Sequence, residues 1–188
     1  MIAASNSLDL VSVKLIRDKT IVYGELIRTP QDLHETVSPL LEDMDREVFA
    51  VINLNNKHQP INLNIVSMGG INKAYVDARE VFKASILSNA VDLCLIHNHP
   101  SGDASPSLED ERLTERLMEG ASLLGFNVLD HIIISPNHTY YSFAENGLME
   151  KIKDNVESRR LMITKRTDKY YQDKASQAVK KTKSDFEF

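Results

Sequence analysis

The sequence predicts an α/β protein in which a mixed sheet lies between two layers of helices. Short stretches with apolar residues at period two alternate along the chain with stretches of helical spacing. In addition, residues 91–99, VDLCLIHNH, begin as a continuous apolar run, which is typical of a strand covered on both faces. The 188 residues, 42% of them hydrophobic, suffice for the core of one ordinary domain.

The first elements are expected to be a β-hairpin and a helix. Residues 8–16, LDLVSVKLI, alternate like a half-buried strand, and residues 21–27, IVYGELI, follow a polar turn as its hairpin partner. A helix is expected from Thr29, because a capping residue precedes a proline and leucines follow at helical spacing. Pro39 is expected to kink or divide that helix.

Strands and helices then alternate to about residue 150. Strands are expected at 47–55, 60–68, 91–99, 128–135 and 139–143. Asp77 is expected to cap a helix that runs to about residue 90. Ser105 and Pro106 are expected to open a second, longer helix that extends through Leu124 and is closed by Gly125. Residues 144–152 end the pattern as a turn or a short helix.

The charge divides the chain into an acidic body and a basic tail. Residues 1–150 carry 11 Lys or Arg and 21 Asp or Glu, a net charge of −10, whereas residues 151–188 carry 11 and 6, a net charge of +5. We expect a hairpin extension at 1–28, one α/β domain at 29–150, and a partly disordered basic tail at 151–188. An acidic body disfavours salt-sensitive nucleic-acid binding, so only the tail offers a weak contact of that kind.

Composition excludes several classes of protein. No apolar run approaches the roughly 18 residues that span a membrane, and the first ten residues lack a signal-peptide pattern, so the expected location is the cytoplasm. The single cysteine, Cys94, lies in an apolar run and is expected to be a buried, protonated core residue. One cysteine cannot supply a thiolate cluster or the paired cysteines of a cytidine deaminase.

The stretch LIHNHPSGDASPSLED, residues 95–110, holds a candidate metal site. His97 and His99 are two residues apart at the end of a strand, so both imidazoles point to one side. The chain then bends, and Asp110 follows about one turn into the next helix, from where it can approach from a third direction. Two histidines and one carboxylate leave the fourth position of tetrahedral Zn²⁺ open to water, as in catalytic sites. A polar turn without a metal is the alternative for each residue taken alone.

This pattern resembles the JAMM motif of the JAB/MPN metallopeptidases, because His97-x-His99 is followed after seven residues by Ser107-x-x-Asp110. The string HNHPSGD resembles the RadC branch of that superfamily. The resemblance extends over about residues 30–150 and includes DREVFAVINLN, AREVFKASILSNA, LLGFNVLDHIII and SFAENGL. It implies a three-layer α/β/α fold with a layout like that of cytidine deaminases.

The resemblance also implies roles for individual residues. His97, His99 and Asp110 would ligate zinc, and Ser107 would orient the water or hold the oxyanion of a tetrahedral intermediate. The general base would be a glutamate that begins an upstream strand, which fits Glu47 best. Glu80 is the rival, although an ion pair with Arg79 or Lys83 is the simpler interpretation of that residue.

The sequence says less about the roles of the other polar residues. Asp130 and His131 interrupt a buried strand, where they must find partners, so His131 is either a satisfied core residue or a neighbour of the zinc ligands. His34, His58 and His138 are expected at the surface.

RadC proteins usually carry a helical, helix-hairpin-helix-like region before the metal domain, and this sequence resembles a short form without it. Three functions remain in competition. The first is a zinc-dependent peptidase or isopeptidase that acts on a peptide or protein substrate. The second is an accessory protein of DNA repair that binds DNA through residues 151–188. The third is a metal-bound interaction module without activity. The substrate and the oligomeric state are not predicted.

Overall fold

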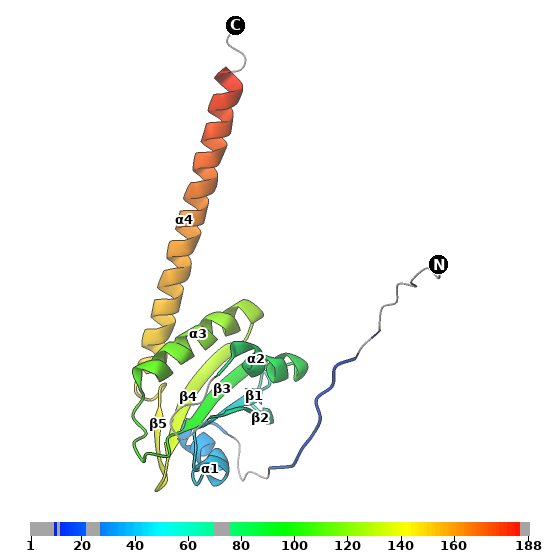
Figure 1. Ribbon diagram of the computed structural model, residues 1–188, viewed down its shortest axis with the longest axis vertical. Helices are drawn as coiled ribbons and strands as arrows, with labels where there is room; N and C mark the ends of the chain where they lie inside the picture. The colour runs from blue at the N-terminus through cyan, green and yellow to red at the C-terminus, as the bar shows by residue number, and fades with distance from the viewer. Residues whose placement is uncertain (1–9, 11, 22–26, 70–75, 185–188) are drawn as a thin grey trace, which may run out of the picture.

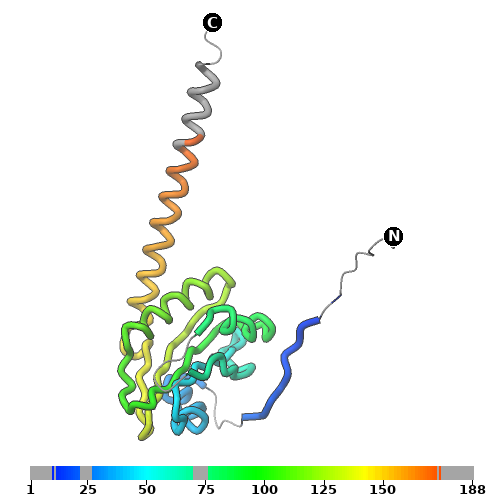
Figure 2. The backbone as a smooth tube through the Cα atoms, viewed as in Figure 1, coloured from blue at the N-terminus to red at the C-terminus, as the bar shows by residue number. Residues whose placement is uncertain are grey.

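The computed structural model describes residues 10, 12–21, 27–69 and 76–184 (Figures 1 and 2). The described elements follow one another in this order: α1 (Pro30–Leu41), β1 (Val48–Leu54), β2 (Pro60–Met68), α2 (Ala78–Leu87), β3 (Asp92–Asn98), α3 (Leu108–Leu124), β4 (Asn127–Ser135), β5 (Thr139–Ser142) and α4 (Leu148–Ser184).

The strands form one five-stranded mixed sheet in the order β2-β1-β3-β4-β5. β3 pairs in parallel with β4 and antiparallel with β1, and the two outer pairs are antiparallel. All seven residues of β3 are buried, as expected for a central strand. The connection from β3 to β4 runs through α3, because parallel neighbours need a crossover.

Helices cover both faces of the sheet, which confirms the three-layer α/β fold (Figure 1). Side chains alternate along a strand, so each strand contributes to two cores. On one face α1 packs against a cluster that includes Ala50, Ile52, Ile96, Ile132 and Ile134. On the other face α2 and α3 pack against a cluster that includes Phe49, Val51, Leu93 and Leu95.

Three helices differ in detail from their predictions, and α2 does so by ending at Leu87 rather than near residue 90. α1 is not divided at Pro39, because this proline lies in the last turn and the helix ends two residues later, at Leu41. α3 begins at Leu108 with Ser107 as its N-cap, two residues after the predicted cap at Ser105. Gly125 ends α3 in the left-handed conformation (φ 81°), as predicted.

The predicted N-terminal hairpin is not found among the described residues. Residues 10 and 12–21 form no strand, and Leu10, Val13 and Ile16 are exposed. The remaining parts of the expected strands, residues 8, 9, 11 and 22–26, lie outside the described residues. An alternating pattern specifies a strand only where a neighbouring strand accepts its hydrogen bonds, and residues 12–21 pair with no described strand.

The C-terminal segment also differs from its prediction. Partial disorder was expected from residue 151, but residues 148–184 form one helix, α4 (Figures 1 and 2). Its first turns are anchored, because Met149, Ile152 and Val156 are buried against Ile133 and Phe143. The rest of α4 projects away from the sheet (Figure 1).

Ion pairs add a second attachment between α4 and α3. Arg159 pairs with Glu115 and with Glu119, the latter at 3.0 Å, and Lys151 pairs with Glu111 at 3.7 Å. Among the described helices, none is both long enough and apolar enough to cross a membrane.

Candidate metal centre

Three side chains converge where β3 ends and α3 begins. His97 is the sixth residue of β3, His99 follows directly after the strand, and Asp110 lies in the first turn of α3. The backbone N–H of His99 donates to Ile134 O at 2.7 Å, which extends the pairing with β4 by one residue. The crossover thus brings α3 back over the carboxyl end of β3, as the sequence predicted.

The ligating atoms of these residues form one compact group. His97 Nε2 lies 2.9 Å from His99 Nε2, and Asp110 Oδ1 lies 3.3 Å from His97 Nε2. Asp110 Oδ2 lies 3.6 Å from His99 Nε2. One atom from each side chain lies within 4.8 Å of the others, so the trio is able to hold a metal ion. His97 is buried, and the other two residues are partly buried.

The hydrogen bond of His99 leaves its other ring nitrogen available to a metal ion. His99 Nδ1 lies 2.7 Å from the backbone oxygen of Asp103, which can only accept, so Nδ1 carries the proton. In the neutral ring, Nε2 then presents a lone pair toward His97 and Asp110. Two imidazole nitrogens and a carboxylate oxygen are donors that suit zinc, so the residues present fit this ion.

The electrostatics of the trio favour a bound cation. Burial by itself raises the pKa of Asp110, but hydrogen bonds from His97 and His99 lower this pKa far below its usual range. Burial by itself lowers the pKa of His99, whereas the hydrogen bonds to Asp110 and Asp103 raise it above its usual value. An ionised carboxylate between two imidazoles therefore attracts a proton or a metal ion.

A second layer of polar residues lies behind His97. His97 Nδ1 is 2.8 Å from His131 Nε2 on β4, and His131 Nδ1 is 2.6 Å from Thr114 Oγ1 on α3. His131 is fully buried, and burial lowers its pKa well below the usual value, so the ring is neutral. His131 was expected to be either a satisfied core residue or a neighbour of the candidate ligands. Its contact with His97 supports the second interpretation.

Thr114 was not singled out from the sequence, because it looks like an ordinary helix residue. Its one signal is its spacing of four residues from Asp110, which places both on the same face of α3. Asp130, beside His131, faces the opposite side of the sheet and accepts from Ser142 Oγ at 2.6 Å and from Ala144 N at 2.9 Å.

Ser107 contacts Asp110 rather than open space. Its hydroxyl donates to Asp110 Oδ2 at 2.6 Å, and its backbone N–H donates to the same oxygen at 2.7 Å. In return, the backbone N–H of Asp110 donates to Ser107 Oγ at 3.2 Å. Because the single hydroxyl proton is already donated to Asp110, the contacts of Ser107 are those of a residue that orients this carboxylate.

Glu47 lies on the same face of the sheet as the two histidines. Phe49 on β1 pairs with His97 on β3, and in this antiparallel register Glu47 precedes Phe49 by two residues as His99 follows His97 by two. The charge of Glu47 contributes to raising the pKa of His99, which also indicates proximity. The side chain is partly buried.

Asn98 forms hydrogen bonds with the backbone on both sides of Glu47. Its side chain is buried, accepts from Val48 N at 2.7 Å and donates to Arg46 O at 3.1 Å. The rival glutamate, Glu80, is exposed on α2 and pairs with Lys83 at 2.7 Å, in agreement with its simpler interpretation.

Other residues are as expected, apart from one histidine. Cys94 is buried, and burial raises the pKa of its thiol to about 12. His58 and His138 are exposed, as predicted. The prediction for His34 is wrong, because the ring is 3% exposed and stacks on Tyr140 with 4.8 Å between centroids. Helical spacing alone does not reveal that α1 turns this residue toward β5.

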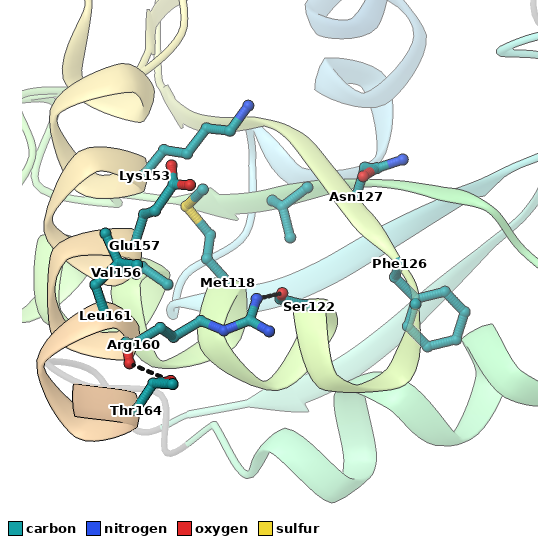
Figure 3. Close-up of a pocket in the computed structure, with 12 residues that line it drawn as sticks. Met118, Ser122, Phe126, Asn127, Lys153, Val156, Glu157, Arg160, Leu161 and Thr164 are labelled. Carbon is teal, nitrogen blue, oxygen red and sulfur yellow. Dashed lines mark hydrogen bonds between the residues drawn. The ribbon is translucent and has the colours of Figure 1, made fainter. Parts of the chain in front are cut away.

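The structure also has a cavity of about 630 Å³ between α3, α4 and the start of β4 (Figure 3). Met118, Val156 and Leu161 line it together with the polar side chains of Lys153 and Arg160. The guanidinium of Arg160 donates to Ser122 Oγ at 2.6 Å (Figure 3). None of the residues that line the cavity belongs to the metal trio, so this cavity is separate from the candidate centre.

Comparisons with known proteins define the class. A family described as the RadC-like JAB domain matches residues 27–148, and the chain belongs to this family. The matched residues include His97, His99 and Asp110, and the family is the one that the sequence motif resembled.

Several curated relatives share this region. The chain is 44% identical over 124 residues to a UPF0758 protein of Desulforamulus reducens, and the match covers 66% of this chain and 54% of the relative. UPF0758 proteins of Desulfitobacterium hafniense and Methanosarcina mazei are 41% and 39% identical over 124 residues, with the same two coverages. The chain thus spans about half the length of the curated relatives it matches.

Proposed function

We propose that this protein is a zinc-dependent hydrolase of amide bonds that acts on a peptide or protein substrate. The observation that carries the proposal is the convergence of His97 Nε2, His99 Nε2 and an Asp110 carboxylate oxygen within 4.8 Å of one another. Membership of the RadC-like JAB family supports the same class of reaction.

His97, His99 and Asp110 would hold the zinc ion. When bound in a site of this kind, zinc lowers the pKa of water to about 7 and polarises a carbonyl oxygen. The pKa of Asp110, far below the usual range, keeps this carboxylate ionised at every pH at which the protein works.

Glu47 has the position of a general base in this proposal. It directly precedes β1, the strand that pairs antiparallel with β3, and it continues the face that carries both histidines. Asn98 fixes the backbone on either side of it. Its carboxylate takes a proton from the attacking water and later gives that proton to the leaving amine. Ser107 serves the reaction by orienting Asp110, because its hydroxyl proton is donated to that residue.

Metal analysis and a peptide assay on the full chain test the proposal. We expect about one zinc ion per chain after dialysis against zinc, and hydrolysis within a panel of fluorogenic peptides and lysine isopeptides. His97→Ala should lose both the zinc and the hydrolysis. His58→Ala is the matched control, because His58 is exposed and lies outside the trio. The absence of zinc from the wild-type protein, together with unchanged hydrolysis in His97→Ala, contradicts the proposal.

A second candidate function, DNA binding, is favoured by one observation on α4. This helix projects from an acidic body, and residues 151–188 carry a net charge of +5. Nucleic-acid binding through α4 predicts an affinity that falls steeply with salt and disappears when residues 165–188 are removed. This truncation keeps Ile152, Val156 and Arg159, which attach α4 to the domain. An affinity for duplex DNA that is independent of salt contradicts this candidate.

A further inference from the structure

The cavity between α3, α4 and the start of β4 has the size and the lining of a small-molecule site (Figure 3). Its volume of about 630 Å³ lies within the roughly 300–1,000 Å³ that ligand pockets occupy. Met118, Val128 and Val156 supply an apolar lining, and each of these residues is buried or half-buried. An apolar lining next to a few polar groups is the usual composition of a pocket that binds an organic ligand.

Two cationic side chains of α4 line this cavity without a carboxylate partner. Lys151 and Arg159 of the same helix pair with carboxylates of α3. Lys153 and Arg160 line the cavity instead, and within the described part of the chain neither of them forms an ion pair. Glu157 is the one carboxylate among the described lining residues, so two cations and one anion leave a formal net charge of +1. This charge favours an anionic ligand.

A hydrogen bond holds the guanidinium of Arg160 at the cavity. The group reaches from α4 to α3, where it donates to Ser122 Oγ at 2.6 Å (Figure 3). This bond uses one of the five N–H donors of a guanidinium, so other donors are left for a ligand. The planar group matches the oxygen atoms of a carboxylate or a phosphate. Because it is already oriented, it loses less conformational freedom when a ligand binds.

We propose that this cavity binds a small amphipathic anion, which carries one carboxylate or phosphate group on an apolar body. The anionic group lies at Arg160 and Lys153, and the apolar body packs against Met118, Val128 and Val156. An inorganic anion would leave the apolar lining unfilled. An uncharged apolar compound would leave both cations without a partner.

This site lies away from the metal trio and does not depend on it. Val128 pairs in parallel with Leu93, which precedes His97 by four residues along β3. At about 3.3 Å per residue, four residues span roughly 13 Å of strand. The ligand contacts three elements at once, because α3, α4 and β4 all line the cavity. Its binding therefore stabilises the attachment of α4 to the domain.

Titration calorimetry of the full chain with two amphipathic anions tests the site. Decanoate and decyl phosphate, both below their micelle concentrations, distinguish a carboxylate from a phosphate ligand. Decyltrimethylammonium carries the same tail with the opposite charge. Arg160→Gln and Arg160→Lys test the contact with the anionic group. Arg166→Gln is the matched control, because Arg166 is an exposed residue of α4 that does not line the cavity.

We expect at least one of the two anions to bind at a single site per chain. Decyltrimethylammonium should bind about tenfold more weakly or not at all, because both cations repel it. Arg160→Gln should weaken the affinity for the anion about tenfold or more, because a hydrogen bond to a charged group is lost. Arg160→Lys keeps the charge without the planar group, so its affinity should lie between those of Arg160→Gln and the wild type. Arg166→Gln should bind like the wild type.

Three results overturn the proposal. They are the absence of saturable binding by both anions, equal affinities for the anions and decyltrimethylammonium, and equal losses of affinity in Arg160→Gln and Arg166→Gln. Circular dichroism of each variant establishes that it is folded. If Arg160→Gln does not fold, Lys153→Gln removes the other cation and decides in its place, and a wild-type affinity in that variant also overturns the site.

Discussion

Ser107 and Asp110 hold each other in a reciprocal pair at the start of α3. Two donors of Ser107 reach Asp110 Oδ2, and the backbone N–H of Asp110 returns a bond to Ser107 Oγ. This pair is the capping box of α3, and it uses the carboxylate that completes the metal trio. The start of the helix and the geometry of the candidate centre therefore depend on the same contacts.

Replacing this serine should affect both properties. Ser107→Ala removes the N-cap, which should lower the free energy of unfolding by about 1 kcal/mol. It also releases Asp110 Oδ2, so zinc affinity should fall roughly 10- to 100-fold. Denaturant unfolding and chelator competition measure the two effects.

The capping box of α1 provides a matched control. Thr29 and Asp32 make the same reciprocal contacts at the start of another helix, and neither belongs to the trio. Thr29→Ala should show a similar loss of stability with no change in zinc affinity. Equal zinc affinities for Ser107→Ala and the wild type would show that the serine does not orient the metal ligand.

Replacing the proposed base, Glu47, should reduce catalysis without affecting metal binding. Glu47→Gln keeps the shape of the side chain but removes its basicity, so hydrolysis should fall about 10²- to 10⁴-fold while zinc content stays constant. Glu80→Gln should leave both unchanged, because that residue pairs with Lys83 on the outer surface of α2. Peptide assays with parallel metal analysis check this; equal activity in Glu47→Gln and the wild type contradicts the role.

His34 should be replaceable with a gain in stability. Among the described residues, neither ring nitrogen of His34 has a hydrogen-bond partner, although the ring is 3% exposed. Leaving a polar group buried without a partner costs about 1–3 kcal/mol. His34→Phe keeps the stacking on Tyr140 and should raise the free energy of unfolding at pH 7.5 by about 1 kcal/mol. A loss of stability in this variant would indicate a polar partner for His34.

Acid should destabilise the metal-free protein below about pH 6.5. Burial lowers the pKa values of His131 and His34, so below the ordinary histidine pKa the unfolded chain binds protons that the folded chain does not. Their stabilising contribution is present above that pKa and is lost as the pH falls. The raised pKa of His99 acts in the opposite direction and reduces the net effect.

The size of this effect follows from proton linkage. Each group contributes at most about 1.4 kcal/mol per pH unit, so the free energy of unfolding should decrease measurably between pH 7 and pH 5.5. Urea titrations across this interval measure the slope. The slope should be smaller in His34→Phe by the share of one histidine, and an identical slope in this variant would exclude His34 as a contributor.

Local patterns predicted most of the sheet and the convergence of His97, His99 and Asp110. Alternation over β1, the apolar run of β3 and the His-x-His spacing are properties of single segments, so the sequence alone carries them. The Thr114–His131 contact was not predictable in this way, because it joins side chains on α3 and β4 that are 17 residues apart in the chain. The same holds for Asn98, whose partners Arg46 and Val48 lie about 50 residues earlier in the chain.

The two ends of the chain were predicted less well, for opposite reasons. Residues 8–16 have the alternation of a strand, yet pairing is a property of two segments, and none of the described strands pairs with residue 10 or with residues 12–16. In α4, a high density of charge indicated disorder. Three apolar residues at helical spacing, Met149, Ile152 and Val156, nevertheless anchor the helix to the domain, and Arg159 binds it to α3.

The length of α4 sets how far its C-terminal end lies from the domain. Thr164 is the last residue of this helix at the cavity beside α3, and twenty further residues lead to Ser184. At about 1.5 Å per residue, they span roughly 30 Å. A seven-residue insertion after Thr164 would lengthen this arm by about 10 Å and, because it adds nearly two whole turns, leave its far end facing almost the same direction.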